Sequence, residues 1–396
     1  MKIGITLGLT KDYESLWING IKLNVLNLVK TLQQIKGYEV YILDTGSKVT
    51  DLSKVSWNAE KYPIYKFIDR WLETDIIIML GTSLPEANIK KLKQHNPNAK
   101  VVKYQCGNNY VVDMERVIFN TAPENAVPSW DGHHDETWLI PQQEYQNLEY
   151  FQAIYRQEKQ QLKVVPFVWD PEHTDNYVNL IKTKGKKGPE YTIDKPREDR
   201  KISVMEPNLN VVKYSMIPLL IAEQVYRTHG EGAFKQIYIG SGDKILKNAY
   251  YKGMLKYLDL VNHNPPLVKY VPRYPVVTFL AEETDIVLSH QWANPLNYAY
   301  LDAMYYGYPL VHNADYIKDA GYYYEGFKVN DGTAQLESAL SAHDPVSYSE
   351  KNKPALERYL TTNPDVVDTY KKLIENLYED KHELSYEYDW KTNLYK

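Results

Sequence analysis

Apolar and polar positions along the chain follow two alternating periods. Residues 2–7 and 38–43 are short apolar runs of the kind that forms strands. Between them, residues 20–35 carry apolar side chains three and four positions apart, which predicts an amphipathic helix. A strand, a helix and a second strand in this order predict parallel pairing with a right-handed crossover.

The same alternation continues through the first half of the chain. Apolar runs at 75–80, 99–104 and 164–168 predict three more strands, and 85–95 and 147–161 are expected to be helical. The isoleucine-rich run at 75–80 is typical of a strand that is buried on both faces. The first half therefore predicts an α/β domain with a parallel sheet.

A second α/β series begins at residue 201. The expected strands are 201–205, 236–239, 285–289 and 309–312, and the expected helices are 213–229, 254–260, 296–306, 333–341 and 364–379. Two successive series of this kind predict two doubly wound, Rossmann-like α/β domains that face each other across a cleft.

The segment between the two series differs in composition. Residues 182–201 hold eight basic and four acidic residues, and their glycines and prolines exclude a long helix. This composition indicates a linker or a mobile loop. The expected division is an N-terminal domain at 1–180, a basic linker or loop at 181–200, a C-terminal domain at 201–378, and a tail at 379–396 that either crosses back to the first domain or is disordered.

Composition narrows the class of protein. The chain has 396 residues, of which 43% are hydrophobic and 24% charged, as in globular proteins. The net charge of −5 argues against a uniformly basic surface for nucleic acid. Cys106 is the single cysteine, which excludes an internal disulfide and a cysteine zinc cluster. No apolar run is long enough to span a membrane and no signal peptide is recognisable, so the expected location is the cytoplasm, or the host cytoplasm if a phage encodes the chain.

The segment from Asp285 to Ala314 carries the strongest motif. A strand ends in polar residues, a loop with Asn294 leads into a helix that carries Asp302, and Gly307 stops that helix before the next strand. Here the chain resembles the nucleotide-sugar glycosyltransferases of the GT-B fold. In that family two glutamates, separated by seven residues, precede a Gly-x-Pro turn, and the second one binds the donor ribose. The resemblance implies that Asp302 is the ribose ligand, while Asn294 departs from the family by standing where the first glutamate is expected.

The resemblance extends to a complete set of donor-binding candidates in the second half. Lys213 follows the first strand of that half, where a basic residue neutralises the donor diphosphate in the family, and helix N-termini offer N–H groups to the same anion. The expected donor is a UDP-sugar, with no tightly bound cofactor and no metal site. The donor-binding candidates are Gly20, Glu206, Asn208, Lys213, Gly240, Ser241, His290, Asn294, Leu296, Asn297 and Asp302.

The first half carries the candidates for acid–base chemistry. An inverting transferase needs a base near the acceptor hydroxyl, and Asp113, Glu115 and His133 lie in regions expected to be loops, as do His134 and Asp135. A retaining enzyme needs no such base. The loop from Gly8 to Gly20 is expected over the reaction centre in the family, although Asn19 and Gly20 are equally consistent with a simple helix cap.

Three segments also resemble a little-characterised family of glycosyltransferase-like proteins from bacteria and tailed phages. They are ESLWINGIK at 14–22, EPNLNVVK at 206–213 and SHQWANPLNYAYLD at 289–302. This resemblance implies a fold and a donor class more than an acceptor. The lysine-, asparagine- and tyrosine-rich composition is similar to that of large tailed-phage enzymes, and with the basic segment 182–201 it favours an acceptor hydroxyl on a hydroxy- or hydroxymethylcytosine of double-stranded phage DNA, with Lys184, Lys186, Lys187 and Arg197 on the phosphates. A transferase for a surface glycan or a protein is the alternative. A non-catalytic nucleotide- or sugar-binding protein is the alternative of another class.

Overall fold

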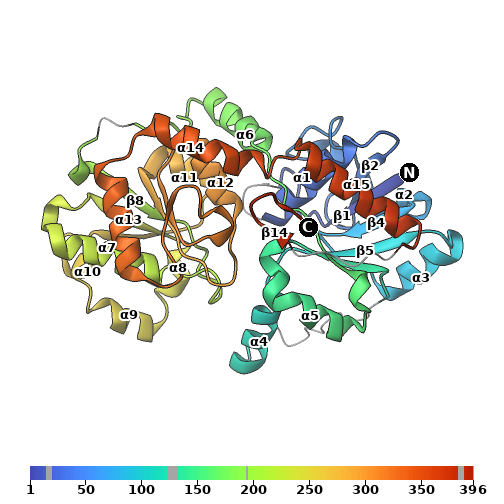
Figure 1. Cartoon of the computed structure of the whole chain (residues 1–396), viewed down its shortest axis with the longest axis horizontal. Coiled ribbons are helices and arrows are strands. Elements are labelled where there is room, and N and C mark those ends of the chain that lie inside the picture. The colour runs from blue at the N-terminus through green and yellow to red at the C-terminus, as the bar shows by residue number, and fades with distance from the viewer. Residues whose placement is uncertain (15–19, 123–132, 193–194, 382–387, 396) are drawn as a thin grey trace. The chain divides into compact units, whose positions relative to one another are not determined.

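The computed structural model of the chain describes residues 1–14, 20–122, 133–192, 195–381 and 388–395 (Figure 1). They form two compact units. Unit 1 comprises Met1–Asp170 together with Arg358–Lys396, and unit 2 comprises Pro171–Glu357. The expected linker at 181–200 therefore lies inside unit 2, and the helix expected at 364–379 belongs to unit 1.

Unit 1 is built on a seven-stranded parallel sheet. Its order is β3-β2-β1-β4-β5-β6-β7, with bounds Ile64–Lys66, Glu39–Asp44, Lys2–Leu7, Ile76–Met79, Lys100–Gln105, Glu136–Leu139 and Leu162–Val164. All four residues of β4 are buried, as expected for a central strand with both faces covered. In Figure 1, β1, β4 and β5 lie side by side.

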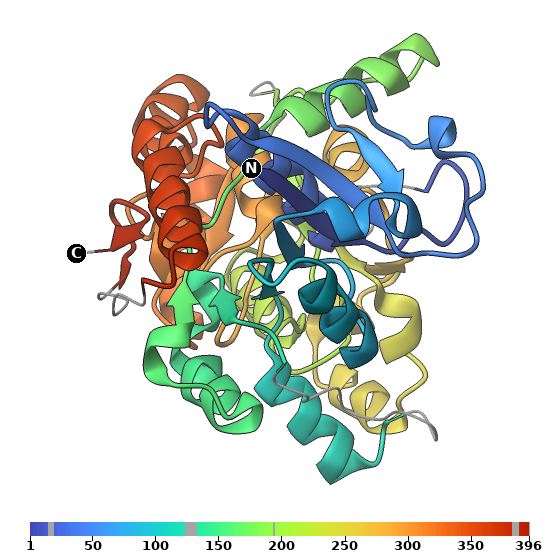
Figure 2. The same ribbon diagram turned by 90° about the vertical axis from the view of Figure 1, so that its right-hand side faces the viewer.

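Helices cover this sheet. They are α1 (Gly20–Gln33), α2 (Phe67–Arg70), α3 (Glu86–His95), α4 (Asn109–Phe119), α5 (Glu144–Tyr155) and α15 (Pro364–Tyr378). Figure 2 shows α15, in red, beside the sheet of unit 1, and α4 pointing away from it. The apolar residues of α3 pack on β4 and β5 in one buried cluster that includes Ile89, Leu92 and Ile77.

The chain leaves unit 1 and returns to it at neighbouring points. Trp169 pairs with Leu360 in a parallel bridge, and the Trp169 N–H donates to the Tyr359 carbonyl at 2.7 Å. A short antiparallel pair near the C-terminus, β14 (Tyr388–Asp389) and β15 (Leu394–Tyr395), encloses the fully buried Asn393. The Asn393 side chain accepts a hydrogen bond from the Phe167 N–H and donates one to the Phe167 carbonyl. These two bonds link the C-terminal pair of strands to the segment that leads out of unit 1.

Unit 2 is built on a six-stranded parallel sheet. Its order is β10-β9-β8-β11-β12-β13, with bounds Val268–Val271, Gln236–Gly240, Lys201–Val204, Ile286–Leu288, Leu310–His312 and Tyr322–Tyr323. The first strand in sequence, β8, lies at the centre beside β11, so the strand order reverses between these two. This is the doubly wound order of a Rossmann-like domain.

The helices of unit 2 complete its two outer layers. They are α6 (Glu172–Thr183), α7 (Met216–His229), α8 (Gly242–Ile245), α9 (Ala249–Leu255), α10 (Asp259–Asn262), α11 (Val276–Glu283), α12 (Tyr298–Tyr305), α13 (Val329–Ser341) and α14 (Pro345–Glu357). Helices α7 and α13 pack closely because Gly332 has no Cβ, which would otherwise lie 2.4 Å from the Ile221 side chain.

Several boundaries differ from those expected from the sequence. The helix expected at 213–229 starts at Met216, so Lys213 lies in the loop before it. The helix expected at 147–161 is α5, which ends at Arg156 in the left-handed conformation. The helix expected at 254–260 is divided into α9 and α10. Strands β3, β6, β10 and β13 and helices α4, α6, α11 and α14 were not expected as such.

Candidate functional site

Polar residues gather where the strands of unit 2 end. Glu206 follows β8, Ser241 follows β9, His290 follows β11 and Asn313 follows β12. Because all strands are parallel, these residues share the carboxyl edge of the sheet. In doubly wound sheets, ligands bind at this edge beside the point where the strand order reverses, which here lies between β8 and β11.

Glu206 is the centre of a buried hydrogen-bond network at this point. Its side chain is 2% exposed. Ser289 Oγ and Tyr300 OH donate to Oε1, the latter at 3.4 Å, and Gln291 Nε2 donates to Oε2 at 3.2 Å. Burial raises the pKa of Glu206, while these hydrogen bonds and the charge of Lys213 lower it. The carboxylate therefore ties β8 to β11 and α12.

The network continues to Asn294, the residue at the position of the family's first glutamate. Asn294 is 7% exposed, and its Nδ2 donates to Gln291 Oε1 and, at 3.1 Å, to the Leu296 carbonyl. The amide is thus oriented through Gln291 by Glu206. The side chain of Leu296 is itself buried in the unit.

Two basic residues, Lys213 and Arg273, lie at the same edge. Lys213 occupies a tight turn whose carbonyl accepts from the Asn208 N–H at 3.1 Å, and Arg273 follows β10. Burial lowers the pKa of Lys213, the charge of Glu206 raises it, and the charge of Arg273 lowers it. Desolvation also lowers the pKa of Arg273. Within the described ranges, neither side chain makes a hydrogen bond or an ion pair, so both cationic groups keep free donors.

Arg273 was missed by the sequence analysis. It follows a four-residue strand, β10, whose run VKYV has a lysine on its exposed side and gave no clear strand signal. Tyr300 was also missed, because a tyrosine on an apolar helix reads as a core residue. A basic residue two positions after Val271, the last residue of β10, is the signal that would have identified Arg273 once the strand was known.

Asn208, Gly240 and Ser241 shape the loops at the carboxyl edge of this sheet. Asn208 has a φ of 51°, and its Nδ2 donates to the Glu206 and Gly240 carbonyls at 3.0 Å. Its Oδ1 accepts from the Ser215 N–H at 2.9 Å, directly before α7. Both ends of this amide are therefore used to hold the loops after β8 and β9 together. Ser241, with a φ of 52°, starts α8.

His290 presents an unused nitrogen. Burial lowers its pKa to about 4, so the ring is neutral near pH 7. Its Nδ1 lies 3.0 Å from Tyr324 OH, which donates to the Ser289 carbonyl at 2.8 Å, and this assigns the ring proton to Nδ1. The buried Nε2 is then an acceptor, and it has no hydrogen-bond partner among the described residues.

Asp302 and Asn297 both belong to α12. Asp302 is 5% exposed, and Asn297 caps the helix by accepting from the Ala299 N–H at 3.4 Å. Gly20 is the first residue of α1 in unit 1, where its carbonyl accepts from Asn24 Nδ2 at 2.9 Å. Ser15, Trp17 and Asn19, from the loop expected over the reaction centre, lie outside the described residues.

The base candidates fall into two groups. Asp113 and Glu115 lie on α4, which follows β5, rather than in a loop, and Asp113 accepts from Tyr150 OH at 2.7 Å. His133, His134 and Asp135 directly precede β6, at the amino edge of the sheet.

Each member of the second group is paired within unit 1. His133 lies 2.9 Å from Glu86, and Asp135 lies 2.5 Å from Lys93. His134 hydrogen-bonds Thr137 at 2.7 Å, and burial lowers its pKa to about 3.

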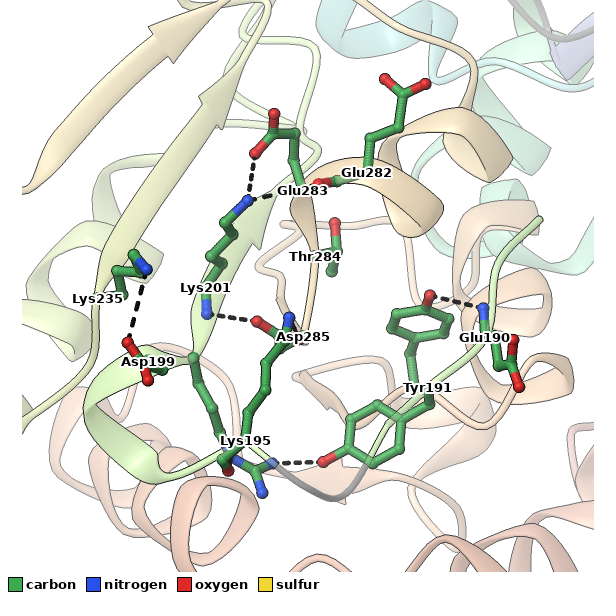
Figure 3. Close-up of polar contacts among 12 residues, drawn as sticks. Glu190, Tyr191, Lys195, Asp199, Lys201, Lys235, Glu282, Glu283, Thr284 and Asp285 are labelled. Atoms are coloured by element: carbon green, nitrogen blue, oxygen red, sulfur yellow. Dashed lines mark hydrogen bonds and ion pairs between the residues drawn. The ribbon is translucent and has the colours of Figure 1, made fainter. Parts of the chain in front are cut away.

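The basic segment lies at the amino edge of the sheet in unit 2 (Figure 3). Lys195 pairs with Asp285, which precedes β11, at 2.7 Å, and Lys201 begins β8. Arg197 is bound to Glu337 at 2.7 Å, and Lys184 caps the end of α6. The candidates Lys184, Lys186, Lys187 and Arg197 therefore lie at the edge opposite to Glu206 and Lys213.

No three His, Cys, Asp or Glu side chains come together as a metal site in the ranges that the structure describes. Among the same residues, no helix is both long and apolar enough to cross a membrane.

Comparison with known proteins gives the family and the fold. Residues 3–374 match the family described as "Protein of unknown function (DUF2827)". This chain belongs to that family. No curated protein matches it.

Solved structures resemble the chain over nearly its whole length at low identity. The N-terminal domain of Candida albicans trehalose-6-phosphate phosphatase has 12% identity and a TM-score of 0.57, covering 95% of this chain and 96% of its own. Sucrose-phosphate synthase from Thermosynechococcus elongatus has 12% identity and a TM-score of 0.55, and the match covers 95% of this chain and 99% of that one. A glycosyltransferase from Rickettsia africae has 10% identity and a TM-score of 0.53, and the match covers 95% of this chain and 98% of that one. The expected fold class, two Rossmann-like α/β domains of the GT-B type, is confirmed.

Proposed function

We propose that this member of the DUF2827 family transfers a sugar from a nucleotide-sugar donor to a hydroxyl acceptor. The donor diphosphate would bind Lys213 and Arg273 at the carboxyl edge of unit 2. The observation that carries the proposal is the pair itself: two neighbouring cations at the ligand-binding edge, neither of which makes an ion pair with a described residue, although the charge of Glu206 acts on Lys213. A leaving nucleoside diphosphate gains negative charge, and fixed cations stabilise it.

The surroundings of the pair agree with this donor. Asp302 on α12 would accept the ribose hydroxyls, as the family resemblance implies. His290 Nε2 is a buried acceptor at the end of β11, available to a donor hydroxyl or N–H. A UDP-sugar, either a hexosyl or a pentosyl donor, is the proposed substrate. Glu206 would act by fixing Ser289, Gln291 and Tyr300 rather than by touching the donor.

The two cations provide the first test. Lys213→Ala and Arg273→Ala should each lower the rate of nucleoside diphosphate release by roughly 10²-fold, the range seen when one donor to a developing oxyanion is removed. The measurement is release of nucleoside diphosphate from a panel of nucleotide sugars. Lys252→Ala removes an equivalent charge from an exposed site on α9 and should keep the wild-type rate. Wild-type rates in both site variants would remove the pair from the mechanism.

The acceptor is the finer part of the proposal. The resemblance to tailed-phage proteins supports a hydroxy- or hydroxymethylcytosine in double-stranded DNA, whereas the placement of the lysine-rich segment at the amino edge gives no support to those lysines as its phosphate contacts. Mass spectrometry of nucleosides from duplex DNA containing hydroxymethylcytosine, after incubation with enzyme and donor, should show a gain of one sugar. Diphosphate release without that gain would exclude this acceptor and leave a glycan or a protein. Donor binding without any release would identify a non-catalytic binding protein.

A further inference from the structure

A polar cavity lies at the amino edge of the sheet in unit 2, the edge opposite to Glu206 and Lys213. Its volume is about 670 Å³, within the range of small-molecule sites. Residues 186–190 and Lys195 line one side, and the end of α11 with the start of β11 forms the other (Figure 3). Five lysines and three acidic residues line it: Lys182, Lys186, Lys187, Lys195, Lys201, Glu190, Glu282 and Asp285.

The walls of this cavity are fixed by contacts inside unit 2. Asp285 accepts from Lys195 Nζ at 2.7 Å and from the Lys201 N–H at 2.8 Å. The Glu190 N–H donates to Tyr308 OH at 3.1 Å, and the Tyr191 ring packs edge-on against Tyr308 with centroids 5.8 Å apart. The lysine-bearing segment is therefore held to the fold at Glu190 and Tyr191 and again at Lys195.

Three of the five lysines that line the cavity are paired with a carboxylate. Lys195 is paired with Asp285, Lys201 with Glu283 at 2.8 Å, and Lys186 more loosely with Glu282 at 3.6 Å. The ammonium groups of Lys182 and Lys187 make no hydrogen bond or ion pair in the part of the chain that the structure describes. An anion that entered the cavity would meet these two ammonium groups without displacing a carboxylate from them.

The chain also makes room for one of these lysines. A Cβ on Gly188 would lie 2.6 Å from Lys182 Cε and 3.4 Å from its Nζ. The absence of a side chain at Gly188 thus lets the Lys182 stem lie against the segment that carries Lys187. Because of this close approach, both unpaired charges border one cavity.

We infer that this cavity is a second ligand site, separate from the proposed donor site, which binds a small phosphate-bearing molecule through Lys182 and Lys187. Lysine ammonium groups bind phosphate oxygens as point charges. Duplex DNA is too wide to enter a cavity of this size, so a small ligand fits these lysines better than a nucleic-acid track. The inference does not depend on sugar transfer.

Lysine acetylation footprinting of the wild-type full chain tests the site, with inorganic pyrophosphate as the probe. At a pyrophosphate concentration about ten times its Kd, competition should slow acetylation of Lys182 and Lys187 by about tenfold. Lys184 belongs to the same segment but does not line the cavity, so its rate should be unchanged. Equal protection of Lys184, or no protection of Lys182 and Lys187, would overturn the inference.

Two further arms separate the alternatives. Calorimetry on the Lys213→Ala/Arg273→Ala protein should still detect pyrophosphate binding, and adding Lys182→Ala/Lys187→Ala should weaken it by about tenfold or more, a loss that Lys184→Ala/Lys252→Ala should not cause. If a DNA duplex instead protects Lys184, Lys186 and Lys187 alike while pyrophosphate protects none of them, the segment is a nucleic-acid surface and the cavity site is wrong.

Discussion

The imidazole of His312 has no exposed surface, and both of its nitrogens are used. Nδ1 accepts from the Ala314 N–H at 3.0 Å, and Nε2 donates to the Ala320 carbonyl at 3.1 Å. Only the neutral ring can satisfy both contacts, because a second proton on Nδ1 would face an N–H group. Burial accordingly lowers the pKa of His312 to about 4. The fold thus selects a single tautomer and excludes the charged form.

Four buried histidines predict how the stability of the protein depends on pH: His134, His290, His312 and His343. Burial lowers the pKa of His290 and His343 to about 4, like that of His312, and that of His134 to about 3, from an ordinary value of 6.5. Below pH 6.5 the unfolded chain binds protons that the folded chain does not, so stability is lost as the pH falls from 6.5 toward 4. Each histidine should contribute about 1.4 kcal/mol per pH unit in that window.

Thermal unfolding at pH 7.5 and pH 5 measures this effect. His312→Gln should reduce the slope of stability against pH by the contribution of one histidine. His95→Gln removes an exposed histidine at the end of α3, so it is the matched control and should keep the wild-type slope. A wild-type slope in the His312 variant would contradict the assignment of this residue.

At the scale of elements, the sequence predicted most of both sheets, because central parallel strands such as β4 are continuous apolar runs. It missed β6, in which the buried Glu136 interrupts the apolar run and accepts from Trp138 Nε1 at 2.7 Å. Without β6, His133 could not be placed at the amino edge. The network of Glu206 with Ser289 was equally hidden, because it depends on β8 and β11 being neighbours in the sheet, and sequence order does not show that.

Asn208 links two elements, and its removal should affect both. Asn208→Ala should lower the stability of unit 2 by about 1–2 kcal/mol, because it removes the contact that caps α7 and strains a residue with positive φ. It should also weaken donor binding, because the turn that carries Lys213 is built on the Asn208 backbone. Asn208→Gly accepts the conformation but lacks the amide, so it separates the two causes. Chemical denaturation and donor titration of both variants are the measurements, and unchanged values in both would show that this amide is dispensable.

At the scale of the whole molecule, unit 1 is assembled from two parts of the chain that are far apart in sequence. Residues 1–170 supply its sheet, and residues 358–396 supply α15 and the pair β14–β15. The buried Asn393 and the bridge between Trp169 and Leu360 join these parts. Unit 2 is one continuous stretch of the chain whose two ends join unit 1 side by side.

This arrangement sets an order of events during synthesis. Every residue of unit 2 is synthesised before Pro364, the first residue of α15. Unit 2 is therefore the first of the two units whose residues are all present during synthesis. Until residues 364–393 have been made, the nascent sheet of unit 1 lacks both α15 and the Asn393 contacts, and part of its apolar surface stays uncovered. Arrest of translation near the C-terminus would therefore release a chain with a finished second unit and an open first one.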